Sequence, residues 1–386
     1  MDIARGAAQA ERSANQVACL RFLAETDAAQ TVGAISAETG LSRPTVHAVL
    51  DDLLDAGLVE STGPSTGGPG RPARAFRFAR EAGLVAGVDL GPRGARAVIC
   101  DLSGRRLAYT ELKPDRRAGL SMVQRAIHAA AEESSIDLGR LRAAGVALPG
   151  VIETNGDLRA SLALPELVGL PIAETVAKDL ALLVAIDNDI KLAALAEQRG
   201  GAGRGYSDVV YLQIGHRLSV SIVLNGVIRQ GRHRLAGELG AQRGMRWTRN
   251  AQRGQLIWTS HPSSEAVLHA AAAGDADAQA EIEDFCTQIA GRIATVLLVV
   301  DPEIVVVRGG SAQDSDALLR PLESAVENEL VFSERPPFVS SALGREAVVL
   351  GAVGNAFDRF GFDIYGVHDY PSPWSRITHD VERTTQ

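Results

Sequence analysis

The chain has 386 residues, of which 46% are hydrophobic and 22% charged, and its formal net charge is −8 at pH 7. This composition is typical of a folded protein with two or three domains and excludes global disorder. The densest apolar run, TVLLVV at 295–300, is far too short to cross a bilayer, so a membrane protein is not expected. The negative charge argues against nucleic-acid binding by the chain as a whole, although one domain can still be basic.

Cysteine usage indicates a reducing environment. Cys19, Cys100 and Cys286 are widely separated and odd in number, which does not fit a disulfide framework. The N-terminal residues lack the charged and apolar segments of a secretory signal. We therefore expect a cytoplasmic location without membrane association.

A first domain is expected at residues 1–80, where three helices precede an arginine-rich segment. Thr31 and Gly40 are the expected N-cap and C-terminal stop of the second helix. Ser42 is the expected N-cap of the third helix, and Pro44 lies in its first turn, where a missing N–H is harmless. Two short helices joined by a tight glycine-containing turn, after a longer helix, are typical of a helix-turn-helix.

The start of the third helix carries the side chains expected to read DNA. In helix-turn-helix domains the second helix of the pair enters the major groove and contacts bases with its N-terminal residues. The predicted DNA contacts on this helix are Ser42, Arg43, Pro44, Thr45 and His47.

The segment 57–78 is predicted to form a two-stranded wing with a flexible tip. Residues 69–80 contain four arginines and no acidic residue. Part of this segment resembles arms whose extended backbone places one arginine in a narrow minor groove. We therefore predict a winged helix that binds double-stranded DNA. Its predicted wing contacts are Gly70, Arg71, Pro72 and Arg74.

From residue 84 strands and helices alternate, which predicts an α/β fold. The first strand, LVAGVDLG at 84–91, ends in Asp89-Leu90-Gly91, and a second acidic stretch follows the strand that ends near residue 187. Two related lobes around a cleft are therefore expected. Further strands are expected within 95–112 and at 144–150, 208–214, 218–226 and 303–310, and helices near 119–134, 277–300 and 315–329.

Four segments of this α/β region resemble the ROK family, named for repressors, open reading frames and kinases. They are GVALPGVIETNGDLRAS, VAIDNDIKLAALAE, IVLNGVIRQGRHRLAGELG and DPEIVVVRGGSA, which begin at residues 145, 184, 222 and 301. GGPGRPAR at 67–74 is similar to the repressor branch of this family. The resemblance implies an actin-like, two-lobed ATPase fold fused to the winged helix-turn-helix, and assembly as a homodimer or homotetramer.

The implied domain boundaries follow from the same resemblance. The winged helix at 1–80 precedes a small lobe at 81–185 plus about 345–370, a large lobe with the dimerisation surface at 186–344, and a tail at 371–386. The tail has no clear periodicity, so we expect it to be partly disordered, with Trp374 docked on a neighbouring surface.

Kinases of this family hold the ATP phosphates in two glycine-rich turns, and both turns are altered here. The first reads Asp-x-Gly-Gly-Thr in the family, whereas in this chain Pro92 removes a backbone N–H and Arg93 adds bulk. The second reads Gly-Thr-Gly-x-Gly in the family, and this chain has His216, Arg217 and Ser219 there. We therefore expect no ATP, no other cofactor and no kinase activity.

The sugar contacts of the family are partly retained. Asp189 matches the catalytic base, which without a phosphoryl donor can still accept a hydrogen bond from a polyol. The alternative is that Asp189 caps the helix that starts at Ile190. Three other family contacts are replaced, by Ala163, Ala241 and Ile257. The predicted effector-binding residues are Pro149, Gly150, Asn188, Asp189 and Glu238.

The structural zinc of the family is not expected. Thr248, Asn250 and Gln255 align with its three cysteines, and a hydroxyl and two amides cannot replace three thiolates. No other metal site is predicted.

A group of basic residues in the second half has two interpretations. One is a solvated surface, and the other is a cleft that takes a phosphorylated or acidic effector, since arginine pairs with such groups through two hydrogen bonds. The group consists of His216, Arg217, Arg229, Arg232, His233 and Arg234.

Together these observations predict a DNA-binding transcriptional regulator, a repressor, whose ROK domain senses a small polar effector without kinase activity. The effector is expected to be a sugar or a sugar derivative, and the operator an inverted repeat of double-stranded DNA. Two alternatives remain open. One is a regulator that binds no sugar and uses its lobes only for oligomerisation, and the other is a sugar kinase.

Overall fold

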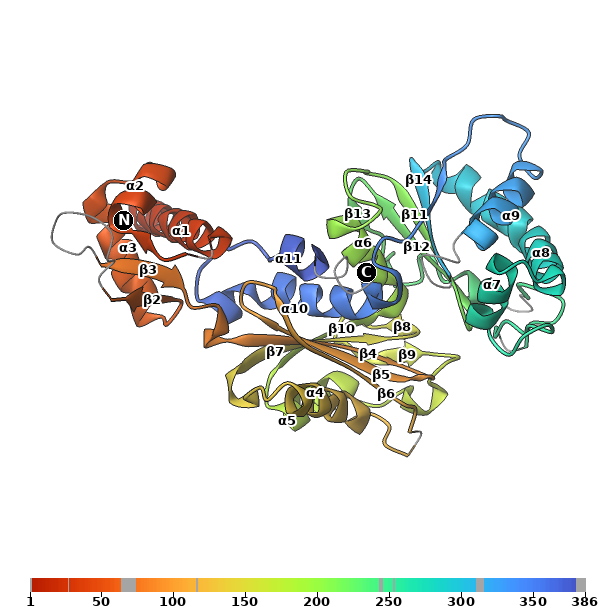
Figure 1. The fold of residues 1–386 in the computed structure, drawn as a ribbon, viewed down its shortest axis with the longest axis horizontal. Helices are drawn as coiled ribbons and strands as arrows, with labels where there is room; N and C mark the ends of the chain where they lie inside the picture. The colour runs from red at the N-terminus through yellow and green to blue at the C-terminus, as the bar shows by residue number, and fades with distance from the viewer. Residues whose placement is uncertain are drawn as a thin grey trace.

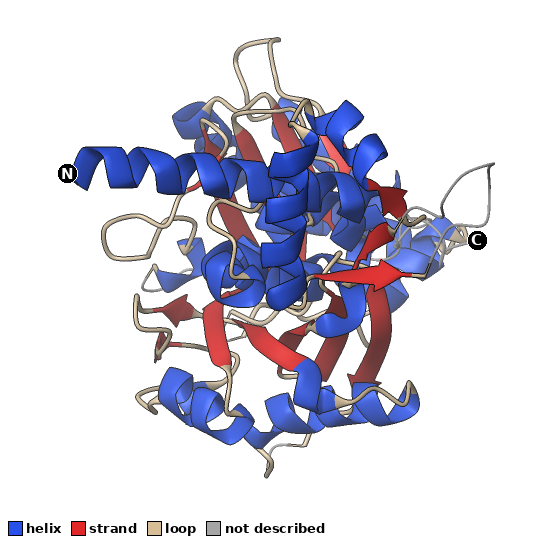
Figure 2. Ribbon diagram, turned by 90° about the vertical axis from the view of Figure 1, so that its left-hand side faces the viewer, coloured by secondary structure: helices blue, strands red, loops and turns tan. Residues whose placement is uncertain are grey.

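The computed structural model describes residues 2–26, 28–63, 74–115, 117–242, 246–252, 254–309 and 316–379. An N-terminal domain, a middle lobe and a second lobe follow one another along the longest axis (Figure 1). In the view turned by 90°, the N-terminal end of the first helix, α1 (Asp2–Glu25), projects from the side of the molecule (Figure 2). No helix in the described ranges has the length and apolar composition needed to cross a membrane.

The N-terminal domain is a winged helix, as the sequence predicts. It contains α1, α2 (Val32–Thr39) and α3 (Arg43–Asp55), with a small sheet in the order β1-β3-β2. Its strands are Gln30–Thr31 for β1, Val59–Thr62 for β2 and Ala75–Phe78 for β3. The prediction missed β1, because two residues carry no periodicity.

The helices of this domain begin and end at the capping residues that the sequence predicts. Thr31 accepts a hydrogen bond from the Ala34 amide, and Gly40 ends α2 in the left-handed region with φ of 72°. Ser42 accepts from the Thr45 amide at the start of α3, whose first turn contains Pro44. The three helices enclose a fully buried core that includes Leu20, Leu23, Ile35, Val46 and Leu50.

The middle lobe is built on a five-stranded sheet in the order β10-β7-β4-β5-β6. β4 pairs antiparallel with β5 and parallel with β7, which in turn pairs parallel with β10, so the carboxyl ends of three strands meet at one edge. The strands are β4 (Leu84–Gly91), β5 (Gly94–Asp101), β6 (Arg106–Leu112), β7 (Leu141–Leu148) and β10 (Leu183–Asn188). Between them, β8 (Val151–Ile152) and β9 (Leu158–Ala160) form a separate hairpin.

Helices cover both faces of this sheet. On one face, α4 (Ser121–Glu133) and α5 (Ile172–Leu180) bury their apolar sides, and α10 (Ala347–Tyr365) lies across the other face (Figure 1). The lobe is therefore completed by a helix that begins more than 150 residues after its last strand.

The second lobe carries another five-stranded sheet, in the order β13-β12-β11-β14-β15. Its strands are β11 (Val209–Ile214), β12 (Leu218–Leu224), β13 (Val227–Ile228), β14 (Ile304–Arg308) and β15 (Phe338–Ser340). One face packs against three helices, α7 (Ser264–Ala272), α8 (Ala276–Val300) and α9 (Asp316–Glu327).

One helix, α6 (Asp189–Gly200), contacts both lobes. Leu192 and Ala193 belong to the core around α10, whereas Ala194 packs against Val209 and Tyr211 of the second sheet. This helix therefore links the two lobes by packing into both cores, and its first residue is Asp189.

Within the tail that is expected to be partly disordered, residues 371–379 form a docked segment that includes α11 (Trp374–His379), and residues 380–386 lie outside the described residues. Trp374 is 7% exposed, and its indole lies on α10, where a Cβ at Gly354 would come within 2.0 Å of the ring. Its Nε1 donates to Asp358 at 3.0 Å. The expectation that Trp374 docks is confirmed, and the helix formed because tertiary contacts outweigh a weak local signal.

Candidate functional site

The first residues of α3 face away from the domain core. Ser42, Arg43 and His47 are exposed, while the opposite side of α3 is buried. The Ser42 and Thr45 hydroxyls bond to each other at 2.8 Å, and Ser42 also caps the helix. Arg43 and His47 therefore extend into solvent from a helix whose other face is fixed, which is the arrangement needed to enter a major groove.

The described part of the wing also carries exposed arginines. Arg74 donates to the Ser61 hydroxyl at 2.6 Å and stacks over Phe76 at 5.1 Å from the ring centroid. Arg77 pairs with Glu60 at 2.7 Å across the two strands. The predicted minor-groove residues Gly70, Arg71 and Pro72 lie outside the described residues.

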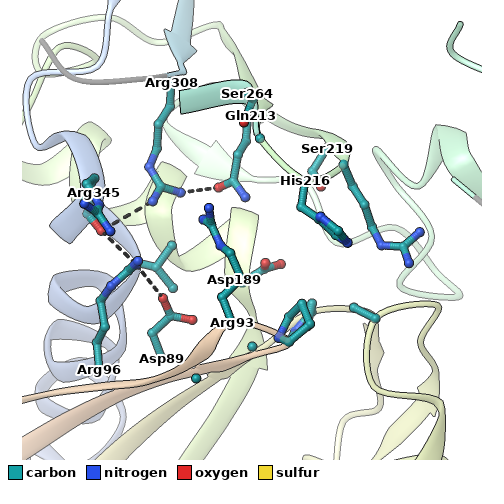
Figure 3. A pocket seen from close by; sticks show the side chains of 18 of the residues that line it. Asp89, Arg93, Arg96, Asp189, Gln213, His216, Ser219, Ser264, Arg308 and Arg345 are labelled. Atoms are coloured by element: carbon teal, nitrogen blue, oxygen red, sulfur yellow. Dashed lines mark hydrogen bonds and ion pairs between the residues drawn. The ribbon is translucent and has the colours of Figure 1, made fainter. Parts of the chain in front are cut away.

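A cavity of about 150 Å³ lies between the two lobes (Figure 3). Its wall combines the turn after β4, the first residue of α6, the turn between β11 and β12, and the end of β14. Ligands of open α/β sheets bind outside the carboxyl ends of strands, and β4 and β14 both end at this wall. Charged and imidazole side chains on this wall include those of Asp89, Arg93, Asp189, His216, Arg217 and Arg308.

Two of the five predicted effector residues, Pro149 and Asp189, line this cavity. Asn188 does not, because its side chain caps α6 by accepting from the Lys191 amide at 3.1 Å and donates to the Gly150 carbonyl at 2.8 Å. The alternative that Asp189 caps this helix is therefore wrong, since Asn188 does so. Among the described residues, Asp189 accepts a hydrogen bond from the adjacent Ile190 amide alone, at 2.8 Å, so its other oxygen is available to the cavity.

Glu238 belongs to a polar cluster that lies beside the cavity wall. Arg234 pairs with Asp187 at 2.8 Å, and Gln230 donates to the same carboxylate at 3.1 Å. Lys191 is buried, and its Nζ donates to the Arg234 carbonyl at 3.2 Å. Burial raises the pKa of Glu238, and the nearby Lys191 opposes that rise. Asp187 is thus held by neighbours within the protein.

The cavity environment changes the acidity of Asp189. Burial raises its pKa from 3.8 to about 7, the neighbouring Asp89 adds to this rise, and the Ile190 amide and Arg308 oppose it. Near neutral pH the carboxyl group is therefore divided between its protonated and ionised forms, so it can donate or accept a hydrogen bond.

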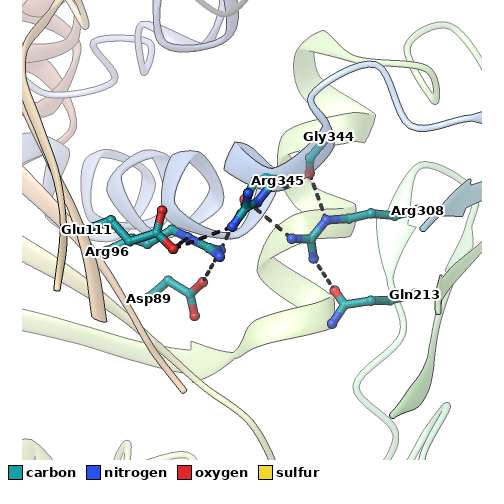
Figure 4. A network of polar contacts seen from close by, with 7 residues as sticks. All are labelled: Asp89, Arg96, Glu111, Gln213, Arg308, Gly344 and Arg345. Carbon is teal, nitrogen blue, oxygen red and sulfur yellow. Dashed lines mark hydrogen bonds and ion pairs between the residues drawn. The ribbon is translucent and has the colours of Figure 1, made fainter. Parts of the chain in front are cut away.

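Arginines and carboxylates form a network along one side of the cavity (Figure 4). Arg96 pairs with Asp89 at 3.2 Å and with Glu111 at 3.3 Å. Arg345 pairs with Glu111 at 3.5 Å and with Glu265 at 3.2 Å. Sequence reasoning missed this network, because its members come from strands and helices far apart in the chain.

The sequence did not identify Arg308 as a residue of the site. Its position at the end of β14 is the signal that could have done so, because ligands bind at the carboxyl ends of such strands. It donates to the side-chain oxygen of Gln213 and, at 2.7 and 3.3 Å, to the carbonyls of Gly344 and Arg345. Burial lowers the pKa of Arg308, whereas Asp89 and Asp189 act in the opposite direction.

The basic residues of the second half divide into two groups. His216 and Arg217 line the cavity, and Arg217 donates to the Leu162 carbonyl at 2.8 Å. Arg229, Arg232 and His233 are exposed on the surface. Arg234, the remaining member, pairs with Asp187 instead. The solvated-surface interpretation thus fits Arg229, Arg232 and His233, and the effector interpretation stays a prediction for His216 and Arg217.

The region aligned with the family's zinc site contains a tight turn in which Gln252 and Gln255 form an isolated bridge. Among the residues that the structure describes, no group of three His, Cys, Asp or Glu side chains is placed to hold a metal ion. The three cysteines are buried.

Comparisons with known proteins agree with both parts of the chain. The ROK family model matches residues 85–254 and 241–357, and the MarR family model matches 12–68. The bifunctional enzyme NanE/NanK of Brucella suis is 30% identical over 237 residues, which cover 58% of this chain and 44% of that protein. The xylose repressor of Caldicellulosiruptor bescii is 26% identical over 212 residues, 53% of each chain.

Solved structures show the same fold. A ROK family transcriptional regulator described as a homologue of the E. coli MLC protein covers 96% of this chain and 99% of its own, with TM-score 0.63 and 20% identity. A ROK family glucokinase from Streptomyces griseus, in complex with glucose and AMPPNP, covers 72% of this chain and all of its own, with TM-score 0.61 and 21% identity. The chain spans about half the length of the first curated relatives, at 44% and 45%. The predicted fold, a winged helix joined to the two-lobed ROK fold, is confirmed.

Proposed function

Because this chain belongs to the ROK family and carries an N-terminal MarR-type winged helix, we propose that it is a DNA-binding transcriptional regulator, acting as a repressor. The observation that carries this proposal is the outward-facing start of α3, where Arg43 and His47 extend from a helix anchored on its other side. A homodimer or homotetramer would present two such helices to an inverted repeat of double-stranded DNA.

Arg43→Ala should weaken operator binding about 10- to 100-fold, since one base contact contributes about 1–3 kcal/mol. It should also relax the base preference at the positions that α3 reads. Fluorescence anisotropy with operator and shuffled duplexes at fixed salt measures both effects. Arg21→Ala removes an exposed cation from α1 and serves as the matched control. Equal affinity of the unaltered protein for operator and shuffled DNA would contradict the proposal.

We propose further that the interlobe cavity binds a small polar effector, a sugar or sugar derivative, and that the protein does not phosphorylate it. Asp189 supports the first part, because its free carboxylate oxygen faces the cavity and can bond a hydroxyl group. Arg93 supports the second part, because its side chain occupies the cavity from the turn that holds phosphate in family kinases (Figure 3).

The C-terminal helix offers a route from this cavity to the winged helix. Asp189 begins α6, and the last residue of α6, Gly200, packs so closely on α11 that a Cβ there would lie 1.9 Å from Thr378 Oγ1. On its other side α11 contacts α1, where Arg376 donates to the Ala24 carbonyl at 2.7 Å. We propose that effector binding shifts α6 and α11 together and so changes the spacing of the recognition helices in the oligomer.

Asp189→Ala should leave operator affinity within about twofold and abolish the response to effector, because a ligand shifts an equilibrium only by its differential affinity for two states. Operator binding against a panel of sugars and sugar phosphates measures this, with Asp363→Ala, an exposed change on α10, as the control. A response that survives in Asp189→Ala would place the effector elsewhere.

The same measurements separate the two alternatives. If the unaltered protein responds to no compound, a regulator that binds no sugar is favoured. The contacts of Asp187 with Arg234 and Gln230 support this alternative, because they already occupy its carboxylate. Sugar-dependent ATP consumption in a coupled assay would instead establish a kinase and overturn the sensor proposal.

A further inference from the structure

A segment of the second lobe, residues 229–238, is bonded to the middle lobe, and we call it the latch segment. It follows β13 and is anchored to its own sheet, because the Arg229 amide donates to the Ile222 carbonyl of β12 at 2.8 Å. Near its other end, a Cβ on Gly237 would lie 2.2 Å from the Val220 carbonyl oxygen, so glycine is needed there. Both ends of the latch segment therefore belong to the second lobe.

The central part of the latch segment reaches across to the middle lobe. Arg234 donates to one carboxylate oxygen of Asp187 at 2.8 Å, and Gln230 donates to the other at 3.1 Å. Arg159 of β9 donates to the His233 carbonyl at 2.7 Å. Asp187 belongs to β10 and Arg159 to the β8–β9 hairpin, so all three hydrogen bonds join one lobe to the other.

The ion pair between Arg234 and Asp187 is partly shielded from water. The two side chains are 18% and 19% exposed, whereas those of Arg345 and Glu265, which join the start of α10 to α7, are 48% and 44% exposed. Water and salt screen exposed ion pairs strongly and partly buried ion pairs less. Of these two ion pairs between the lobes, the one in the latch segment is therefore the stronger.

Arg234 makes this contact from a strained backbone conformation. Its φ is 57°, in the left-handed region that glycine, asparagine and aspartate adopt more readily than arginine. Among the described residues, its Nε is buried without a hydrogen-bond partner, and so is the side-chain oxygen of Gln230. Such strain persists only where surrounding contacts hold it. The ion pair therefore draws the latch segment toward the middle lobe, while the strain and the unpaired groups favour its release.

The latch segment also contacts the beginning of α6. The Asp187 carboxylate accepts a further hydrogen bond from the Asn188 amide at 2.8 Å, and Asn188 caps α6. Lys191, in the first turn of α6, is buried and donates from its Nζ to the Arg234 carbonyl at 3.2 Å. Loss of the ion pair would therefore act on the helix that packs into the cores of both lobes.

We propose that the Arg234–Asp187 ion pair is a releasable latch that holds the two lobes at this closure without a ligand. The latch itself follows from the contacts of residues 229–238 with the middle lobe and α6. Its consequence rests on the proposed function: the closed latch keeps the regulator in its operator-binding geometry, and release weakens operator binding. Arg234 acts through Asp187 and α6, so it is a positioning residue.

Hydrogen exchange of the full-length protein, read by mass spectrometry, tests the latch directly. Arg234→Asn removes the charge and suits the left-handed backbone. The amides of residues 229–238 should then exchange about tenfold faster, the effect expected for loss of a hydrogen bond to a charged group. Asp187→Asn should give the same increase, and the double variant should exceed neither single variant, because all three lose one ion pair. Unchanged exchange in β7 shows that the fold is intact.

The distance between the lobes provides a second measurement. Asp179→Cys on α5 and Asp277→Cys on α8 place spin labels at exposed positions of the two lobes, and the native cysteines are buried. Arg234→Asn should broaden or lengthen the distribution of distances between the labels. Arg232→Asn, which removes an exposed arginine from the same segment, is the matched control and should not.

Three results would overturn the latch. One is an exchange rate in the double variant equal to the product of the two single effects, which would mean that the two side chains act independently. Another is a distance distribution that Arg234→Asn leaves unchanged. The third is an equal effect of Arg232→Asn and Arg234→Asn in either measurement.

Operator binding by the same variants separates the latch from the proposed function. Arg234→Asn should lower operator affinity about fivefold or more, the lower end of the usual coupling between sites, and Arg232→Asn should not. Unchanged operator affinity in a variant whose lobes have opened would overturn the regulatory role of the latch. If the unaltered protein passes the exchange and distance tests but does not distinguish operator from shuffled DNA, the regulator proposal alone fails. Operator specificity without the expected exchange and distance changes refutes the latch alone.

Discussion

Replacing Asp189 by asparagine should stabilise the folded protein by up to about 4 kcal/mol at pH 8, and by clearly less at pH 5. The pKa of Asp189 is raised from 3.8 to about 7 in the folded state, and each pKa unit corresponds to about 1.36 kcal/mol. A carboxyl group with a raised pKa binds its proton more tightly in the folded than in the unfolded chain. Its stabilising contribution is complete below the unfolded pKa and is lost as the pH rises through the folded pKa.

Urea denaturation of both proteins at pH 5 and pH 8 measures this difference. Asparagine does not ionise. The difference in free energy of unfolding between the variant and the unaltered protein should therefore grow by about 3 kcal/mol from pH 5 to pH 8. Asp363→Asn, which removes an exposed carboxylate from α10, is the control. If Asp189→Asn raises the free energy of unfolding by the same amount at both pH values, burial does not raise the pKa of Asp189.

Trp374→Ala should lower the free energy of unfolding by about 3–5 kcal/mol, the usual cost of removing a buried aromatic ring. Trp374 is 7% exposed, its indole fills the space beside Gly354, and its Nε1 bonds to Asp358 at 3.0 Å. Chemical denaturation measures this loss of stability. Trp374→Phe should be destabilised less than Trp374→Ala, because an aromatic ring remains in the site. Stability unchanged in Trp374→Ala would mean that α11 does not dock on α10 in solution.

The same substitution also tests the proposed role of α11 in communication. Undocking α11 would separate Arg376 from the Ala24 carbonyl of α1 and Thr378 from Gly200 of α6, and so break the link that α11 makes between these two helices. At a temperature where the variant is still folded, it should bind operator and respond weakly or not at all to effector. A full response would place the communication elsewhere.

The features that the sequence by itself determined are those with a local physical cause. Ser42 and Pro44 start α3 because a hydroxyl satisfies a free amide and proline needs none. Gly40 ends α2 because glycine adopts the left-handed region without strain. The apolar runs at 84–91 and 304–308 became strands because their periodicity and length are sufficient signals. These signals also carried the family resemblance, and with it the fold.

The features that only the tertiary structure decided depend on contacts between distant segments. Asn188 and Asp189 are adjacent in the chain and equally suited to cap a helix, and only the packed structure places Asn188 at the cap and Asp189 at the cavity. Arg93 and Arg308 are 215 positions apart, and their approach follows from the closure of two lobes around α6. The segment 371–379 became ordered because α6 and α10 supply the surface that its own sequence lacks. Local propensity cannot predict such contacts, because their free energy arises from burial and charge brought together by the whole fold.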